Sequence, residues 1–395
     1  MPPNAATGLV NSGNLCHLTL GVDDALDLDP AILDDISTTF PGLHSFTLYS
    51  VSTHTTGLTS LPHIIDNNSL IWRLPHLRSL DISVGHTITR SILVSLSEIS
   101  LQSLTLGYFS TSITPQSPRL HFPALRHLSL TAVASSVVDI LQAISFPNAT
   151  GLFLRMDIFD DTRSAPVHRT TFNIIYSTFP TSLRRVYIEI ISSKWGQVEE
   201  SWLGPDAINF DDFVQPLKSL RGLRELKLNV RLTRHVRGFL ELHDADLRSL
   251  IPSWPELVLF EYTVPTYWHA PTSLPQDDPT LDTIFAFARA HPHLLHLELS
   301  YMRVPGGPDD LPSQENTPPP LEGHGLLWFK VGWPADGAGK GVPLEPAVQA
   351  LDRAFPQVGK TLRRDRPIAR GLNRMRAYLE AELFNLHAGE GVPGA

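Results

Sequence analysis

The sequence predicts an α/β solenoid of irregular leucine-rich-repeat type, with one curved parallel sheet and helices on its outer face. A short leucine phrase recurs eleven times along the 395 residues, and segments with helical spacing separate many of the phrases. A chain of this length exceeds the roughly 250 to 300 residues at which single cores stop growing. The alternative is an ordinary α/β domain with scattered amphipathic strands, but eleven phrases favour a repeat array.

Each phrase consists of Leu, two variable residues, an apolar residue, one variable residue and a final apolar residue, as in Leu125, Leu128 and Leu130. The last two apolar positions face the same way on a β-strand, and the residue between them faces the other way. Start-to-start spacings of 28, 34, 24, 24, 24, 34, 40, 34, 37 and 32 residues indicate a 24-residue unit with insertions. The phrases begin at Leu15, Leu43, Leu77, Leu101, Leu125, Ala149, Leu183, Leu223, Leu257, Leu294 and Leu326.

The segments between phrases have the apolar spacing of helices, and many of them end at a proline. Acidic or hydroxyl residues often open them, as helix N-termini prefer, and proline cannot continue a helix. Strand, turn, helix and proline in repetition predict a right-handed array whose strands form one parallel sheet. We expect helices at 29–40, 89–100, 135–146, 280–291 and 345–355.

The chain is expected to have three parts: a lead-in at 1–14, the repeats at 15–356 and a basic C-terminal helix and tail at 357–395. Within the repeats, residues 303–325 are rich in Pro, Gly and acidic groups, which predicts a surface loop insertion. The C-terminal part holds seven Lys and Arg residues between Lys360 and Arg376. Two interpretations stay open: a nuclear-import or acidic-partner patch, and a solvated helix that caps the last repeat.

Composition excludes several classes of function. The formal charge of −9 argues against a nucleic-acid binder, because phosphate binding needs a positive surface. The single cysteine, Cys16, rules out an internal disulfide framework and suits a reducing compartment. No run of about 18 apolar residues and no signal-peptide pattern is present, so neither membrane spanning nor secretion is expected. We therefore expect a cytoplasmic or nuclear chain whose partner is another protein.

No motif supports catalysis or a cofactor, so the expected function is binding without catalytic residues, cofactor or metal. The GAGKG segment at 337–341 lacks the first glycine and the Ser or Thr of a phosphate-binding loop. His291, His293 and His296 lie close in sequence, but no carboxylate or cysteine completes a tetrahedral set. Nucleophile elbows, HExxH helices and paired CxxC motifs are absent from the sequence.

The strand residues that alternate with the buried leucines should face the open side of the sheet, which is the usual binding face of such arrays. In the first five repeats these residues are small and polar, such as Thr19, Ser45 and Ser103, or they are His17 and His127. Later repeats mix charge with aromatic residues of the kind enriched at binding hot spots. The predicted partner-binding residues are Arg185, Tyr187, Glu189, Glu225, Lys227, Glu261, His296, Glu298, Trp328 and Lys330.

The phrases LPHLRSLDI (74–82), FPALRHLSL (122–130) and HPHLLHLEL (291–299), with VGWP at 331–334, resemble the leucine-rich-repeat region of fungal F-box proteins, especially those of mushroom-forming fungi. In that family an N-terminal F-box docks onto the Skp1 adaptor of a cullin ubiquitin ligase, and the repeats select the substrate. The resemblance implies a substrate-recognition module. The first phrase here begins at Leu15, which leaves no room for an F-box before it. The alternatives are a scaffold or assembly protein that has lost its F-box and acts outside the ligase, and an enzyme built on a repeat scaffold.

Overall fold

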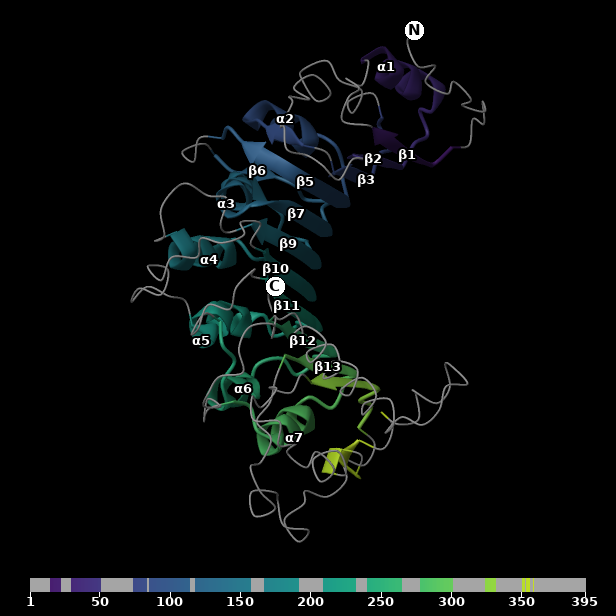
Figure 1. Cartoon of the computed structure of the whole chain (residues 1–395). Coiled ribbons are helices and arrows are strands. Elements are labelled where there is room, and N and C mark those ends of the chain that lie inside the picture. The colour runs from purple at the N-terminus through teal and green to yellow at the C-terminus, as the bar shows by residue number, and fades with distance from the viewer. Residues whose placement is uncertain are drawn as a thin grey trace, which may run out of the picture. The chain divides into compact units, whose positions relative to one another are not determined.

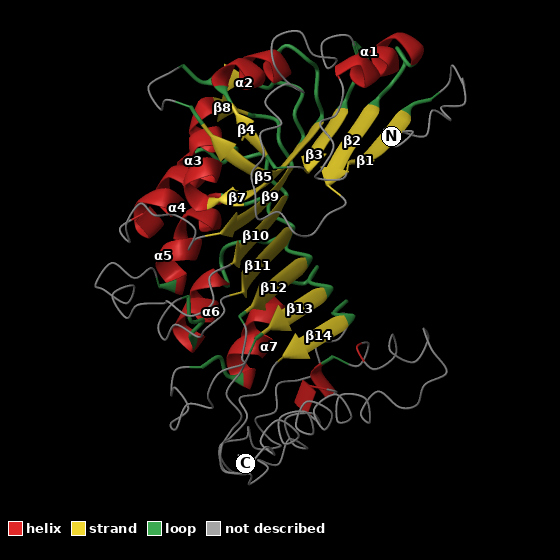
Figure 2. Ribbon diagram, turned by 45° about the horizontal axis from the view of Figure 1, so that its top comes forward, coloured by secondary structure: helices red, strands yellow, loops and turns green. Residues whose placement is uncertain are grey.

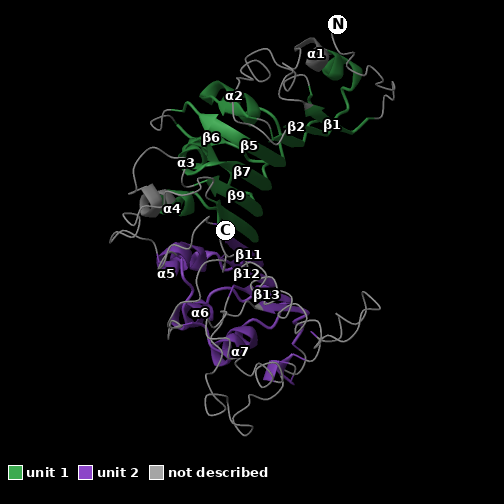
Figure 3. Cartoon of the chain, viewed as in Figure 1, with its two compact units in different colours: residues 1–195 green, residues 196–395 purple. Residues whose placement is uncertain are grey.

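The structure is a computed structural model that divides into two compact units, residues 1–195 and 196–395, coloured separately in Figure 3. Within them it describes residues 15–22, 30–50, 74–83, 85–113, 118–157, 167–191, 209–231, 240–264, 278–300, 324–331, 350–351, 353–355 and 358. Four predictions lie outside these ranges: the lead-in at 1–14, the GAGKG segment, most of the 303–325 insertion and the basic C-terminal part.

Seven parallel strands form the main sheet of the first unit, in the same order as along the chain (Figure 1). They are β1 (His17–Val22), β2 (Ser45–Ser50), β3 (Ser79–Ser83), β5 (Ser103–Thr111), β7 (His127–Val133), β9 (Gly151–Asp157) and β10 (Arg185–Ile191). Three short strands lie beside them: β4 (His86–Ile88) pairs with β5, and β6 (Leu120–His121) pairs with β8 (Ile144–Ser145).

Helices of the first unit lie together on one side of its sheet (Figure 2). They are α1 (Pro30–Thr39), α2 (Arg90–Ser97), α3 (Ala134–Ala143) and α4 (Val167–Ser177). The hydroxyl of Thr89 accepts a hydrogen bond from the amide of Ile92, so α2 begins with the hydroxyl cap that its sequence predicts. The segment 135–146 is helical only to Ala143, because Ile144 and Ser145 turn extended and pair with β6.

The second unit repeats this plan, and its described strands are four in number and parallel. Its strands are β11 (Glu225–Arg231), β12 (Leu259–Thr263), β13 (His296–Leu299) and β14 (Trp328–Val331). Its helices are α5 (Phe210–Val214), the 3₁₀ helix η3 (Gln215–Ser219), α6 (Asp244–Leu250) and α7 (Leu281–Ala290). Asn209 and Thr280 cap α5 and α7 through their side-chain oxygens. Of the helix expected at 345–355, the described residues Ala350, Leu351, Arg353 and Ala354 are helical.

The apolar residues of the phrases form the core between sheet and helices. All eleven phrases lie on or directly before a strand, and the central position of each is buried, from Leu226 at 0% exposure to Leu18 and Phe329 at 9%. Strand pairing aligns these residues across each unit, for example Leu226 with Phe260 and Phe260 with Leu297. Each fully buried side chain contributes about 1.5 to 3 kcal/mol relative to an exposed one. The predicted fold class, an α/β leucine-rich-type solenoid with parallel strands and helices, is therefore confirmed.

A proline turn connects most helices to the following strand. At the turns after α1 and α6 the residue before the proline, Phe40 or Trp254, is buried, and its carbonyl accepts a hydrogen bond from the first residue of the phrase, at 3.1 Å for Leu43 and 3.0 Å for Leu257. His291 occupies this position in the HPHL segment and is also fully buried. Its Nδ1 lies 2.7 Å from the carbonyl oxygen of Phe287. His291 is thus a core residue.

Candidate protein-interaction surface

The ten predicted partner-binding residues divide between the two units. Arg185, Tyr187 and Glu189 lie on β10 of the first unit, and the other seven lie on β11–β14 of the second unit. All ten alternate with buried residues along their strands, as the phrase predicts. Glu189 differs from the rest because its exposure is only 9%, and its carboxylate lies 3.7 Å from the guanidinium of Arg155 on β9. The sequence predicted that the Glu189 carboxylate would be exposed on the binding face.

Parallel pairing in the second unit gathers its seven residues into two rows across the strands. Glu225, His296 and Trp328 belong to the first row, in which Leu259 fills the β12 position. The second row runs Lys227, Glu261, Glu298 and Lys330. Neighbouring strands lie about 4.8 Å apart, so side chains of one row contact each other directly. The structure therefore brings these seven predicted residues into one surface.

The second row pairs its charges internally. Lys227 Nζ lies 2.9 Å from Glu261 Oε2, and Lys330 Nζ lies 2.7 Å from Glu298 Oε1. His296 Nε2 lies 3.7 Å from the other oxygen of Glu298. The adjacent His296 imidazole, together with Lys330, holds the pKa of Glu298 below its ordinary value of 4.5, although partial burial opposes this shift. Opposite charges thus neutralise each other within the row.

The first row presents apolar surface at β13 and β14. The Trp328 indole stacks on the His296 ring with centroids 5.8 Å apart and planes inclined by 13°, yet Trp328 remains 45% exposed. Leu295 and Leu327 directly precede these residues and are 40% and 42% exposed. The amides of both Leu327 and Trp328 donate to the Leu295 carbonyl, which holds the two leucines side by side. We call Leu295, His296, Leu327 and Trp328 the apolar patch.

Sequence reasoning missed the two leucines of the apolar patch. Each follows directly after the buried first leucine of its phrase, Leu294 or Leu326, so a run of two leucines resembles continuous core. The signal that distinguishes them is their place in the phrase, since the second position points away from the core in other repeats as well. Arg126 and Arg224, which are exposed, occupy that position before β7 and β11.

One group on this face has the donor atoms of a metal site. In the described part of the chain, Glu261, His296 and Glu298 form the group of three whose ligand atoms lie within 4.8 Å of one another. Both carboxylates already contact a lysine ammonium, so a divalent cation would have to displace Lys227 and Lys330. The histidine cluster considered from the sequence does not form, because His291 is buried in the core and His293 is exposed at the turn.

The open face of the first unit carries a different cluster at β7, β9 and β10. Gly151 separates His127 from Arg185 in one row, and Phe153 pairs in register with Tyr187 in the next row. A Cβ atom at Gly151 would lie 2.7 Å from His127 Nδ1, so the imidazole lies over the glycine. Partial burial and the charges of Arg185 and Arg126 lower the pKa of His127 below 6.5. Phe153 was absent from the predicted site, although its alternation with Leu152 and Leu154 marks it as a face residue.

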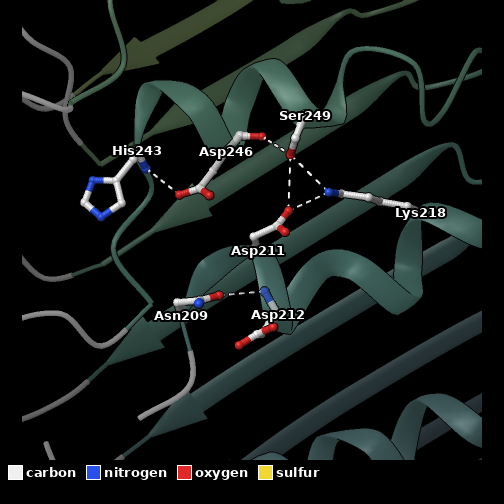
Figure 4. Close-up of polar contacts among 7 residues, drawn as sticks. All are labelled: Asn209, Asp211, Asp212, Lys218, His243, Asp246 and Ser249. Atoms are coloured by element: carbon white, nitrogen blue, oxygen red, sulfur yellow. Dashed lines mark hydrogen bonds and ion pairs between the residues drawn. The ribbon is translucent and has the colours of Figure 1, made fainter. Parts of the chain in front are cut away.

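A polar network on the helix side of the second unit has the residue types of a catalytic group, shown in Figure 4. Lys218 Nζ lies 2.6 Å from Asp211 Oδ1 and 3.0 Å from the Ser249 hydroxyl, which donates to the Asp246 carbonyl. Lys218 Nζ is bound by both the Asp211 carboxylate and the Ser249 hydroxyl, so the network joins η3, α5 and α6 as a structural clamp.

The fold and the open face define the class of this protein as a leucine-rich-type repeat protein with a candidate interaction surface. No protein family model matches the chain, and no curated protein matches its sequence. Among solved structures, the chain is similar to a protein from Bacteroides fragilis, with a TM-score of 0.34 and 16% identity over 61% of this chain and 75% of that one. It is also similar to an internalin from Listeria monocytogenes, with a TM-score of 0.35 and 11% identity over 85% of this chain and 84% of that one.

None of the helices in the described part of the chain is a candidate membrane-spanning segment. No helix in the described part of the chain combines the length and the hydrophobicity that crossing a lipid bilayer requires.

Proposed function

We propose that this protein is a recognition module that binds another protein through the open face of its sheet, with the apolar patch as the anchor. The observation that carries the proposal is the 45% exposure of Trp328 beside Leu295 and Leu327 on an open strand surface. Large aromatic side chains with adjacent apolar surface supply most of the binding energy at protein interfaces. The paired charges of Lys227, Glu261, Glu298 and Lys330 border this patch as a polar rim.

The test compares proteins retained from the cell lysate by the full chain and by its Trp328→Ala variant, identified by mass spectrometry. A true partner is retained by the wild-type chain and lost with the variant, because truncation of an interface tryptophan costs more than about 1 kcal/mol, or roughly fivefold in affinity. Tyr49→Ala is the matched control, since Tyr49 is a 42% exposed aromatic residue on β2. Equal recovery with wild type and Trp328→Ala would contradict the proposal.

The resemblance to F-box repeats supports a finer proposal, in which the bound protein is a substrate of a cullin ubiquitin ligase. Skp1 and a cullin should then be recovered in the same experiment, independently of Trp328. Recovery of a Trp328-dependent partner without Skp1 and cullin would favour the alternative, a scaffold or assembly protein that acts outside the ligase.

We further propose that this module binds without catalysing a reaction. The Ser249 and Lys218 pair supports this view, because Lys218 Nζ is bound to the Asp211 carboxylate and the Ser249 hydroxyl donates to the Asp246 carbonyl. Hydrolysis of activated ester substrates by the full chain, lost in Ser249→Ala but retained in Ser253→Ala, would contradict it.

A further inference from the structure

The basic residues on the open faces differ in whether they have an acidic partner, and in the first unit Arg155 has one in Glu189, at 3.7 Å. In the second unit, Lys227 pairs with Glu261, Lys330 with Glu298, and Arg224 at the start of β11 pairs with Glu256 at 3.1 Å. Arg126 and Arg185 of the first unit are exposed, and among the residues that the structure describes neither guanidinium forms an ion pair. Two arginines of one surface thus keep their full charge in a protein whose net charge is −9.

These arginines frame a defined place on the sheet. Arg126 directly precedes β7 and Arg185 begins β10, with β9 between the two strands. Because adjacent strands lie about 4.8 Å apart, β7 and β10 are about 10 Å apart. Residue 151 on β9 is a glycine, so β9 places no side chain between the two arginines at this row. The His127 imidazole lies in that space. Partial burial and the charges of Arg185 and Arg126 lower the pKa of this ring and so favour its neutral form, which can donate or accept a hydrogen bond.

Aromatic surface adjoins the arginines in the next row. Phe153 and Tyr187 are neighbours in the register of β9 and β10 and are both half-buried, so part of each ring faces the open side. An extended peptide advances about 3.3 Å per residue, so carboxylates three residues apart span the distance from β7 to β10. Apolar side chains between those carboxylates would lie over Phe153 and Tyr187.

We propose that the surface formed by Arg126, His127, Phe153, Arg185 and Tyr187 binds an extended acidic segment of a protein partner. Guanidinium groups bind carboxylates through paired hydrogen bonds, and within the described ranges no carboxylate forms an ion pair with Arg126 or Arg185. A peptide is favoured over a nucleic acid because two free guanidiniums neutralise few phosphates and the chain as a whole repels a polyanion. The inference rests on the proposed function, since it assigns this part of the open face to an acidic region of the partner.

The experiment measures binding of a fluorescein-labelled hexaglutamate peptide to the full chain by fluorescence anisotropy at about 50 mM salt, where the screening length exceeds 10 Å. Hexaglutamine is the uncharged control probe. We expect Arg126→Gln and Arg185→Gln each to weaken hexaglutamate binding by about threefold or more and the double variant by about tenfold, as lost charge-assisted hydrogen bonds do. Arg78→Gln is the matched control, because Arg78 is an exposed arginine directly before β3 of the same unit.

Three outcomes would overturn the inference: no difference between hexaglutamate and hexaglutamine, equal weakening by Arg78→Gln, or tighter binding of a single-stranded oligothymidylate than of hexaglutamate. The measurement also separates this inference from the proposed function. Trp328→Ala should leave hexaglutamate binding unchanged while it removes the lysate partner. If hexaglutamate does not bind the chain but the Trp328-dependent partner is still recovered, only the acidic-segment site is contradicted.

Discussion

The open faces of the two units differ sharply although their buried rows are alike. Along β2, β3 and β5 the face carries many small hydroxyl residues such as Ser45, Thr47 and Ser103, beside Tyr49 and Asp81, whereas the second unit presents paired charges and the apolar patch. Behind both faces lie the same buried leucines, isoleucines and phenylalanines. Because the two sets of positions alternate along each strand, the face can change its chemistry without changing the fold.

The largest expected effect is on stability, and it comes from the buried apolar rows that each unit has. Leu128→Ala in the first unit and Leu226→Ala in the second should each lower the free energy of unfolding by about 2 to 5 kcal/mol, because both side chains are at most 2% exposed. The measurement is urea unfolding of the full chain, with hydrogen exchange to locate the weakened unit. Ser129→Ala, one position after Leu128, and Asn229→Ala, three positions after Leu226, alter face residues and should change stability by less than about 0.5 kcal/mol. Similar losses for buried and face positions would contradict the division between them.

A smaller effect is expected from the paired charges of the face rows, which are close in the second unit, at 2.9 and 2.7 Å, and more distant for Arg155 and Glu189 of the first unit, at 3.7 Å. Glu298→Gln removes the negative charge that pairs with Lys330 and should cost about 0.5 to 1 kcal/mol at pH 7, since the lysine is 53% exposed. The lowered pKa of Glu298 means that its stabilising contribution is complete above pH 4.5 and is lost as the pH falls through the folded-state pKa. The difference between wild type and variant should therefore shrink in acid. A difference that stays constant from pH 7 to pH 3 would show that Glu298 acts by packing alone.

The smallest effect concerns the glycine that makes room for His127. Gly42→Ala should stabilise the chain by up to about 1 kcal/mol, because a Cβ there meets nothing within 4 Å. Gly151→Ala should lack this gain, because its Cβ would approach His127 Nδ1 to 2.7 Å and displace the ring. Thermal unfolding of both variants tests the difference. If Gly151→Ala stabilised as much as Gly42→Ala, the imidazole would not need the space above residue 151.

Predictions from the sequence were correct for features that depend on a single strand. The phrase placed Leu226, Phe260 and Leu297 in the core and Trp328 on the face, because alternation along a strand depends only on local geometry. It failed for Leu295 and Leu327, whose exposure depends on how the chain enters the strand. It also expected Glu189 to be open, but Arg155 of the neighbouring strand covers and pairs with it.

By itself the sequence determined the repeated strands, the helices between them and the parallel leucine-rich-type fold, because a periodic row of apolar residues has one face to bury. Only the tertiary structure decided which charges neutralise one another. Lys227 and Glu261 are 34 residues apart in the chain, and they meet at 2.9 Å because the register of β11 and β12 sets them side by side. The same register leaves Arg126 and Arg185 without a carboxylate among the described residues. Cross-strand register depends on the length and packing of each intervening segment, which no single phrase contains.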